Sequence, residues 1–190
     1  MIEQKEAILR LMNEYCYRID AGDIEGFSEL FERGSFHVLG DPSGPDVGKD
    51  AVLATLQNVI MYDGRPQTQH VMSNVQIDVR ESGIEATAQC YITVFQAVPP
   101  DFPMQPIFGG HYHDRLQRAE SGWHFVSREI SPDLLGDLAV IVRIWSEPGC
   151  GLRFNNATFV RNRATACPDI PRHWSAKPGN LMLESGSEVR

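Results

Sequence analysis

Apolar side chains recur at helical spacing near the start of the chain. Between residues 7 and 19 they lie three or four positions apart, as in a helix that packs one face on a core. These positions are Ala7, Ile8, Leu11, Met12, Tyr15 and Ile19. Ala21-Gly22 predicts the end of this helix, because glycine readily adopts the left-handed conformation that closes a last turn. Asp23 then predicts the N-cap of a second helix over residues 24–31.

A short strand, a turn-rich loop and a third helix are predicted next. Residues 35–39 predict the strand, and residues 40–46 predict the loop because Gly, Asp, Ser and Pro dominate them. From Gly48 onward, apolar residues at positions 52, 53, 56, 59 and 60 predict the helix. Gly64-Arg-Pro66 then breaks the pattern.

From residue 68 onward the period of the apolar positions changes to two, which indicates β-strands. The predicted strands cover residues 68–80, 84–98, 107–118 and 123–131. In the first of them we expect one apolar face, made by Val71, Val75, Ile77 and Val79. Three helices followed by a run of antiparallel strands predict an α+β fold, in which a curved sheet covers the helices and encloses a pocket.

Composition narrows the classes of function. The 190 residues suit one domain with a sizeable core, and a net charge of -8 argues against nucleic acid or an anionic membrane as a partner. The chain opens without a signal-like apolar segment, and its apolar runs fall short of the roughly 20 residues of a spanning helix. The four cysteines form no CxxC pair. We therefore expect reduced thiols and a cytoplasmic protein.

The amino-acid composition changes after Trp145. Residues 146–190 are rich in Pro, Gly and Asn and show little apolar periodicity, which predicts an irregular or partner-supported segment. We therefore expect one domain over residues 1–140 and a C-terminal tail over residues 141–190.

Asp20 ends the first predicted helix and His70 opens the first long strand, and these two are the candidate chemical residues. Taken alone, Asp20 is most simply a solvated carboxylate, and His70 would only bond a backbone carbonyl. As a pair they suit acid–base chemistry, because histidine is available as a base at neutral pH and a carboxylate fixes its tautomer. Tyr15 lies on the apolar stripe, where a core tyrosine is as reasonable as a proton donor.

Four segments carry a resemblance to a known family. They are "YCYRIDAGD", "GRPQTQHVMSNVQIDV", "GGHYHDRLQRAESGWHF" and "SPDLLGDL". Their order and spacing, over about residues 3–140, resemble the SnoaL-like branch of the NTF2-like superfamily. That branch includes scytalone dehydratase, the bile acid 7α-dehydratase and the hexachlorocyclohexane dehydrochlorinase. The resemblance implies a cone-shaped α+β barrel with one pocket inside the cone.

The resemblance also implies roles for named residues. Asp20 and His70 match the Asp and His at the centres of the family's eliminating enzymes, and Tyr15 matches a tyrosine of the bile acid enzyme. Five residues are expected to contact substrate: Leu39, Tyr91, Phe95, His111 and His113. Two of these differ from scytalone dehydratase. Leu39 stands roughly where that enzyme has a tyrosine, and Phe95 roughly where it has a second catalytic histidine.

The expected function is a cofactor-independent lyase of the dehydratase type, or an isomerase, acting on a small, largely apolar hydroxylated or carbonyl compound. A metal site at His111 and His113 is the less favoured interpretation, because no acid follows at a suitable spacing. Two other functions stay open: a non-catalytic ligand-binding protein, and the small subunit of a ring-hydroxylating dioxygenase. In each case we expect a homo-oligomer, because the sheet leaves an outer face exposed, and relatives favour a trimer.

Overall fold

Three helices and a six-stranded sheet make up most of the structure. The computed structural model describes residues 2–138, 141, 152–155 and 158–161. The elements are α1 (Ile2–Ala21), α2 (Ile24–Glu29), β1 (Ser35–Val38), β2 (Asp46–Val47), α3 (Lys49–Leu56), β3 (Thr68–Val79), β4 (Glu85–Val98), β5 (Phe102–Ala119) and β6 (Gly122–Leu135). This confirms the predicted α+β order of helices followed by long strands.

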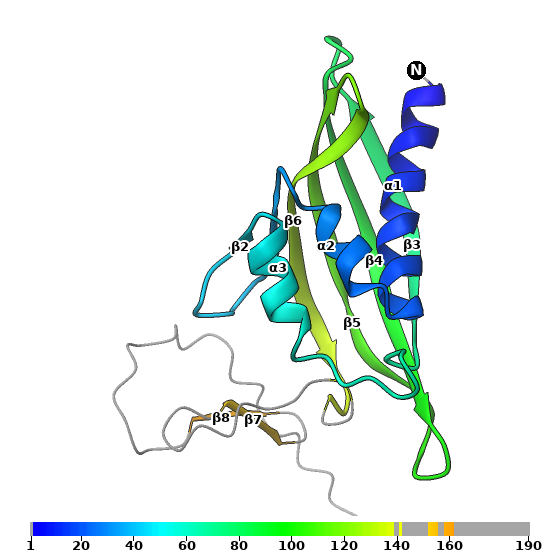
Figure 1. Ribbon diagram of the computed structural model, residues 1–190, viewed down its shortest axis with the longest axis vertical. Helices are drawn as coiled ribbons and strands as arrows, with labels where there is room; N and C mark the ends of the chain where they lie inside the picture. The colour runs from blue at the N-terminus through cyan, green and yellow to red at the C-terminus, as the bar shows by residue number, and fades with distance from the viewer. Residues whose placement is uncertain (1, 139–140, 142–151, 156–157, 162–190) are drawn as a thin grey trace, which may run out of the picture.

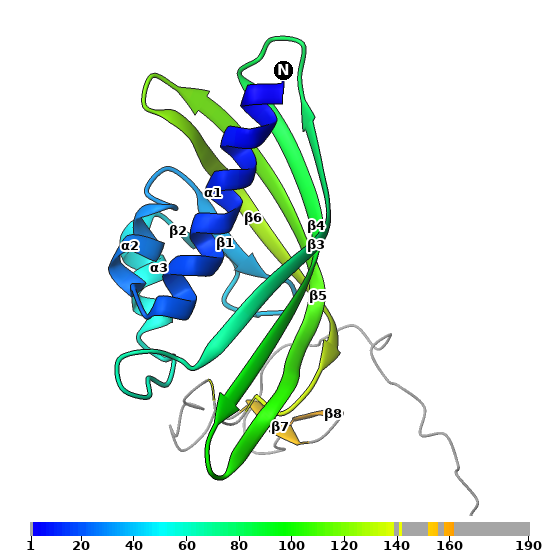
Figure 2. The ribbon, with the colours of Figure 1, turned by 90° about the vertical axis from the view of Figure 1, so that its right-hand side faces the viewer.

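The sheet bends strongly and keeps the helices on one side (Figures 1 and 2). Its strand order is β2-β1-β6-β5-β4-β3, with antiparallel pairing throughout except between β1 and β6. The predicted antiparallel run is confirmed for β3 to β6, and the short strand β1 joins β6 in parallel. Strands β1 and β6 can run parallel because the chain between them includes a helix and three long strands, which return it in the same direction.

Helix α1 buries one apolar face against the sheet. Its buried residues are Ile8, Met12, Tyr15, Cys16 and Ile19, so the predicted stripe holds except that Ala7 is exposed and Cys16 joins the core. In the views of Figures 1 and 2 the helix lies along β3, with which it shares many contacts. This packing brings the C-terminal end of α1 to the start of β3.

The end of α1 closes as the sequence predicts. Gly22 has a φ of 80°, and the backbone N–H groups of Gly22 and Asp23 donate to the carbonyls of Ile19 and Arg18 at 3.0 and 2.9 Å. Asp23 caps α2, since its carboxylate accepts from the N–H of Gly26 at 2.9 Å. The tight closure holds Asp20 in the last turn of the helix.

A bulge in β3 changes which residues face the core. The pairing with β4 shifts between Ser73 and Gln76, and Asn74 adopts a φ of 54°. An extra residue in one strand reverses the alternation beyond it. As a result Val71 is 40% exposed on the outer face, while His70 faces inward. The prediction that Val71 shares a face with Val75 is therefore wrong.

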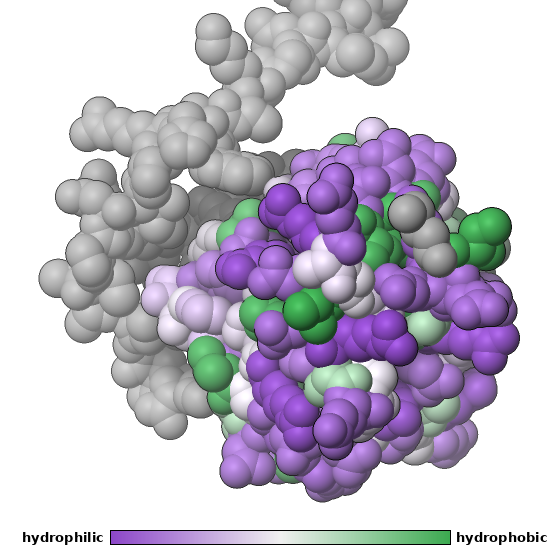
Figure 3. Space-filling model, turned by 90° about the horizontal axis from the view of Figure 1, so that it is seen from above, coloured by the Kyte–Doolittle hydropathy of each residue, from purple (hydrophilic) through white to green (hydrophobic). Residues whose placement is uncertain are grey.

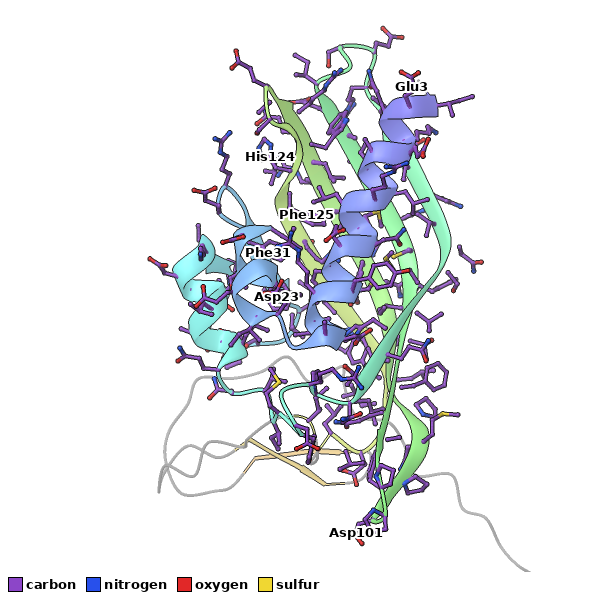
Figure 4. The ribbon with its side chains drawn as sticks, turned by 45° about the vertical axis from the view of Figure 1, so that its right-hand side comes forward. Glu3, Asp23, Phe31, Asp101, His124 and Phe125 are labelled. Atoms are coloured by element: carbon purple, nitrogen blue, oxygen red, sulfur yellow. The ribbon has the colours of Figure 1, made fainter. Side chains whose placement is uncertain are left out.

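A second bulge lies in β6. The pairing of β5 with β6 shifts between Arg115 and Leu116, which leaves Val126 unpaired. Phe125 and Arg128 consequently both face the core and are fully buried. Figure 4 shows Phe125 pointing toward Phe31, and their rings stack with centroids 5.2 Å apart.

The predicted domain boundary and tail lie largely outside the described residues. Within the tail, the strands β7 (Leu152–Asn155) and β8 (Thr158–Arg161) pair antiparallel. The division into residues 1–140 and 141–190 stays a prediction.

The surface seen from above is mostly hydrophilic, with apolar residues in small groups (Figure 3). Within the described residues, no helix combines the length and the apolar character needed to span a bilayer.

Candidate functional site

Asp20 and His70 are in direct contact, although 50 positions separate them in the chain. His70 Nδ1 lies 2.6 Å from Asp20 Oδ1, and the backbone N–H of His70 donates to Asp20 Oδ2 at 2.8 Å. The two side chains are 11% and 21% exposed, for His70 and Asp20 respectively. The end of α1 and the start of β3 therefore build one half-buried acid–imidazole pair.

A third donor completes the surroundings of the Asp20 carboxylate. The hydroxyl of Thr68 donates to Oδ1 at 2.7 Å. Burial raises the pKa of the Asp20 carboxyl, but the hydrogen bonds and charge of His70, together with the Thr68 hydroxyl, outweigh burial and hold that pKa below its ordinary value. Asp20 is therefore an anion at neutral pH.

The contact fixes the chemistry available at the imidazole. An ionised carboxylate only accepts hydrogen bonds, so His70 Nδ1 must carry the proton that lies between the two groups. In the neutral ring Nε2 then keeps its lone pair and can take a proton. This arrangement suits a general base whose protonated form the adjacent carboxylate stabilises.

Tyr15 is next to this pair, but its hydroxyl points elsewhere. Its ring meets that of His70 edge-on, with centroids 6.3 Å apart. The hydroxyl of Tyr112 lies 3.5 Å away and donates to that of Tyr15. Burial raises the pKa of Tyr15 to about 12 despite the opposing charge of Arg128. The structure thus places Tyr15 in the core beside the pair, as a neutral phenol.

A buried ion pair adjoins Tyr15, and the sequence did not predict it. Arg128 donates to both carboxylate oxygens of Asp114, at 2.8 and 2.6 Å, and both side chains are fully buried. The guanidinium lies over the rings of Tyr15 and Tyr112, 4.1 and 4.3 Å from their centroids. Among the described residues, Arg128 Nη1 has no hydrogen-bond partner. The core beside the acid–imidazole pair therefore holds a buried guanidinium whose charge the Asp114 carboxylate neutralises.

Four of the expected substrate contacts lie on the other face of the sheet. Tyr91, Phe95, His111 and His113 alternate with buried inward-facing residues, among them Ile92 and Tyr112. Within this set, Tyr91 is paired opposite His111, with ring centroids 4.5 Å apart. The structure therefore does not bring these four residues together with Asp20 and His70.

The outer-face histidines have surroundings of their own. His111 Nδ1 lies 2.5 Å from Asp133 Oδ2, and the side chain of His111 is 36% exposed. A polar cleft of about 310 Å³ opens beside His113, between residues of β3, β4, β5 and β6. In the part of the chain that the structure describes, no group of three or more His, Cys, Asp or Glu side chains is arranged to hold a metal ion.

Leu39, the fifth expected contact, follows directly after β1. Its backbone N–H donates to the carbonyl of Ile130 at 2.8 Å, and the residue is 41% exposed. Phe36 and Val38 face the core, and Leu39, one position further along, points to the opposite side. The structure therefore does not place Leu39 with the acid–imidazole pair either.

Comparison with known proteins decides the family. The sequence profile of the SnoaL-like domain matches residues 1–129. The chain belongs to the SnoaL-like family. No curated protein matches this SnoaL-like chain at a significant level.

Solved structures place the SnoaL-like chain in the NTF2-like fold. An NTF2-like protein with a cystatin-like fold from Novosphingobium aromaticivorans is 27% identical, with a TM-score of 0.59 over 73% of this chain and 87% of that one. A protein from the same organism, provisionally named as a scytalone dehydratase, is 25% identical, with a TM-score of 0.59 over 72% and 88%. A third, provisionally named as an aromatic ring hydroxylase, is 23% identical, with a TM-score of 0.60 over 74% and 97%.

Proposed function

We propose that this SnoaL-like protein is a cofactor-independent lyase of the dehydratase type, or an isomerase. Its substrate is a small, largely apolar compound that carries a hydroxyl or carbonyl group. The observation that carries the proposal is the 2.6 Å contact between His70 Nδ1 and Asp20 Oδ1 in a half-buried place. The similarity to a protein provisionally named as a scytalone dehydratase supports the same class of reaction.

The proposed chemistry begins with proton transfer to His70. Nε2 takes a proton from the carbon next to the substrate carbonyl, and Asp20 stabilises the resulting imidazolium. The electron pair of the broken C–H bond moves onto the carbonyl oxygen of the substrate, which gives an enolate. In a dehydration, the imidazolium then returns the proton to the leaving hydroxyl, which departs as water. In an isomerisation, it returns the proton to a different carbon.

Loss of the His70 imidazole tests this function. We expect His70→Ala to lower kcat/KM by roughly a hundredfold to ten-thousandfold, the usual contribution of one well-placed acid or base. The measurement is the rate of water loss or double-bond migration across a panel of small hydroxy-ketones. His113→Ala is the matched control, because it removes an imidazole from the outer face of the same sheet, and it should keep the wild-type rate.

Near-full activity in His70→Ala would contradict the proposal. A non-catalytic ligand-binding protein, or the small subunit of a ring-hydroxylating dioxygenase, predicts instead that wild type and both variants leave the whole panel unchanged.

We also propose a cytoplasmic homo-oligomer, with a trimer favoured. Exposed apolar side chains on the outer face of the sheet support association, and among them are Val71 and Tyr91. The buried free thiols of Cys16 and Cys90 support a reducing compartment.

A further inference from the structure

Thr68 is the least expected member of the candidate site. It opens β3 two positions before His70, so both side chains face inward, while Gln69 between them is exposed on the outer face. Both residues then reach the end of α1 from one strand. We propose that Thr68 is a positioning residue, which holds the Asp20 carboxylate in the ionised form and orientation that His70 requires. This inference rests on the function proposed above.

The hydrogen-bond pattern around the carboxylate carries this inference. Oδ1 accepts from the Thr68 hydroxyl at 2.7 Å and from His70 Nδ1 at 2.6 Å. Oδ2 accepts from the backbone N–H of His70 at 2.8 Å. The His70 backbone N–H holds Oδ2. Oδ1 is bonded to the His70 imidazole, which is the group that the site must orient. The Thr68 hydroxyl is therefore the side-chain donor that fixes Oδ1 independently of the imidazole.

The residue type suits the task. A β-branched side chain has restricted χ1 freedom in a strand, so the hydroxyl is held where it points. The Thr68 hydroxyl helps to lower the pKa of Asp20, after the larger effects of His70, which agrees with a supporting role. Without this donor, the carboxylate could rotate around its hydrogen bond to the His70 backbone N–H. Oδ1 would then contact the imidazole for less of the time.

Substitution by valine keeps the shape and removes the donor. In full-length Thr68→Val we expect kcat to fall roughly three- to tenfold with little change in KM, as for the loss of one hydrogen bond. Carbon NMR of the side-chain carboxyl should show the pKa of Asp20 rising toward its ordinary value. Thr68→Ser keeps the hydroxyl without the β-branch and should restore most of both properties. Thr93→Val is the matched control, because Thr93 faces outward on β4 and should leave both unchanged.

The two readouts separate this inference from the function on which it rests. The carboxyl titration needs no substrate, so it tests the hold of Thr68 on Asp20 even if the panel of hydroxy-ketones shows no turnover. An Asp20 titration that is the same in wild type and Thr68→Val would overturn the inference, and so would a titration that Thr68→Ser fails to restore.

Discussion

Asp20 is the residue on which the candidate site depends most. A helix-end carboxylate is usually solvated, but here donors from three groups surround it: the Thr68 hydroxyl, the His70 backbone and the His70 ring. These contacts replace water around a charge, which makes the carboxylate part of the fold as well as part of the site.

The charge on Asp20 should make stability depend on pH. Its pKa in the folded protein lies below the ordinary value of 3.8, so ionisation favours the fold. The stabilisation is fully present above pH 3.8 and is lost as the pH falls through the lower, folded value. We expect Asp20→Asn to lower the free energy of unfolding by about 1–3 kcal/mol at pH 7. The difference in the free energy of unfolding between wild type and Asp20→Asn, measured by urea unfolding, should be clearly smaller at pH 3.

Asp101→Asn supplies the comparison for this experiment. Asp101 is exposed in the turn between β4 and β5, at the far end of the molecule from Glu3 in Figure 4. Its removal should cost almost nothing at either pH. A stability gap for Asp20→Asn that is as wide at pH 3 as at pH 7 would show that the carboxylate charge contributes nothing to the fold.

Sequence reasoning found some of these residues and missed others for identifiable reasons. The sequence pattern put Asp20 at the end of a helix and His70 at the start of a strand, and the resemblance to the SnoaL-like family implied that they form a pair. Thr68 was missed because a threonine in a strand has no distinctive pattern. Arg128 was missed because simple alternation from Phe125 puts position 128 outside, and only the bulge at Val126 turns it inward.

At the scale of elements, periodicity predicted which segments fold but not where strands slip. The bounds of β3 and β4 lie within one residue of the predicted ranges. Strand β5 starts earlier than predicted, at Phe102, and β6 ends later, at Leu135. The bulge at Ser73–Gln76 depends on Asn74 in a left-handed conformation, which asparagine tolerates but does not require. Which residues of a strand face the core therefore depends on the assembled sheet.

The end of α1 provides an element-scale prediction. Gly22 has a φ of 80°, and a Cβ added there would overlap with the carbonyl oxygen of Gly64, in the loop that leads into β3. We expect Gly22→Ala to lower the free energy of unfolding by about 1–3 kcal/mol, from backbone strain together with displacement of this loop. Urea unfolding measures the cost.

Gly40→Ala separates the two causes. Gly40 has a φ of 95° but open space around its Cα, so alanine there meets strain without a clash. It should cost less than Gly22→Ala. Equal costs would mean that the close approach of α1 to the Gly64 loop adds nothing to stability.

At the scale of the whole molecule, the fold decides which polar residues are inside. The alternation of β5 predicted that His111 and His113 share a face, and they do, but the other face is the buried one. A charged residue such as Asp114 is normally expected outside. It is inside because Arg128, on the neighbouring strand, neutralises it within the core. That partnership depends on the packing of the complete sheet.

The same architecture brings the end of the first helix to the first long strand. Figure 2 shows the layer of helices against the bent sheet. This arrangement brings Asp20 to His70 across 50 residues of chain. The family was recognisable from ordered sequence segments, but the contact itself could only be seen once helix and sheet were placed together.

The protonation state of the His70 ring tests this contact most directly. Long-range ¹H–¹⁵N NMR on the wild-type chain distinguishes the two neutral tautomers. The contact with Asp20 predicts that neutral His70 carries its proton on Nδ1 and leaves Nε2 bare, and that Asp20→Asn weakens this preference. A neutral His70 ring with its proton on Nε2, unchanged in Asp20→Asn, would show that the carboxylate and the imidazole do not work as a pair.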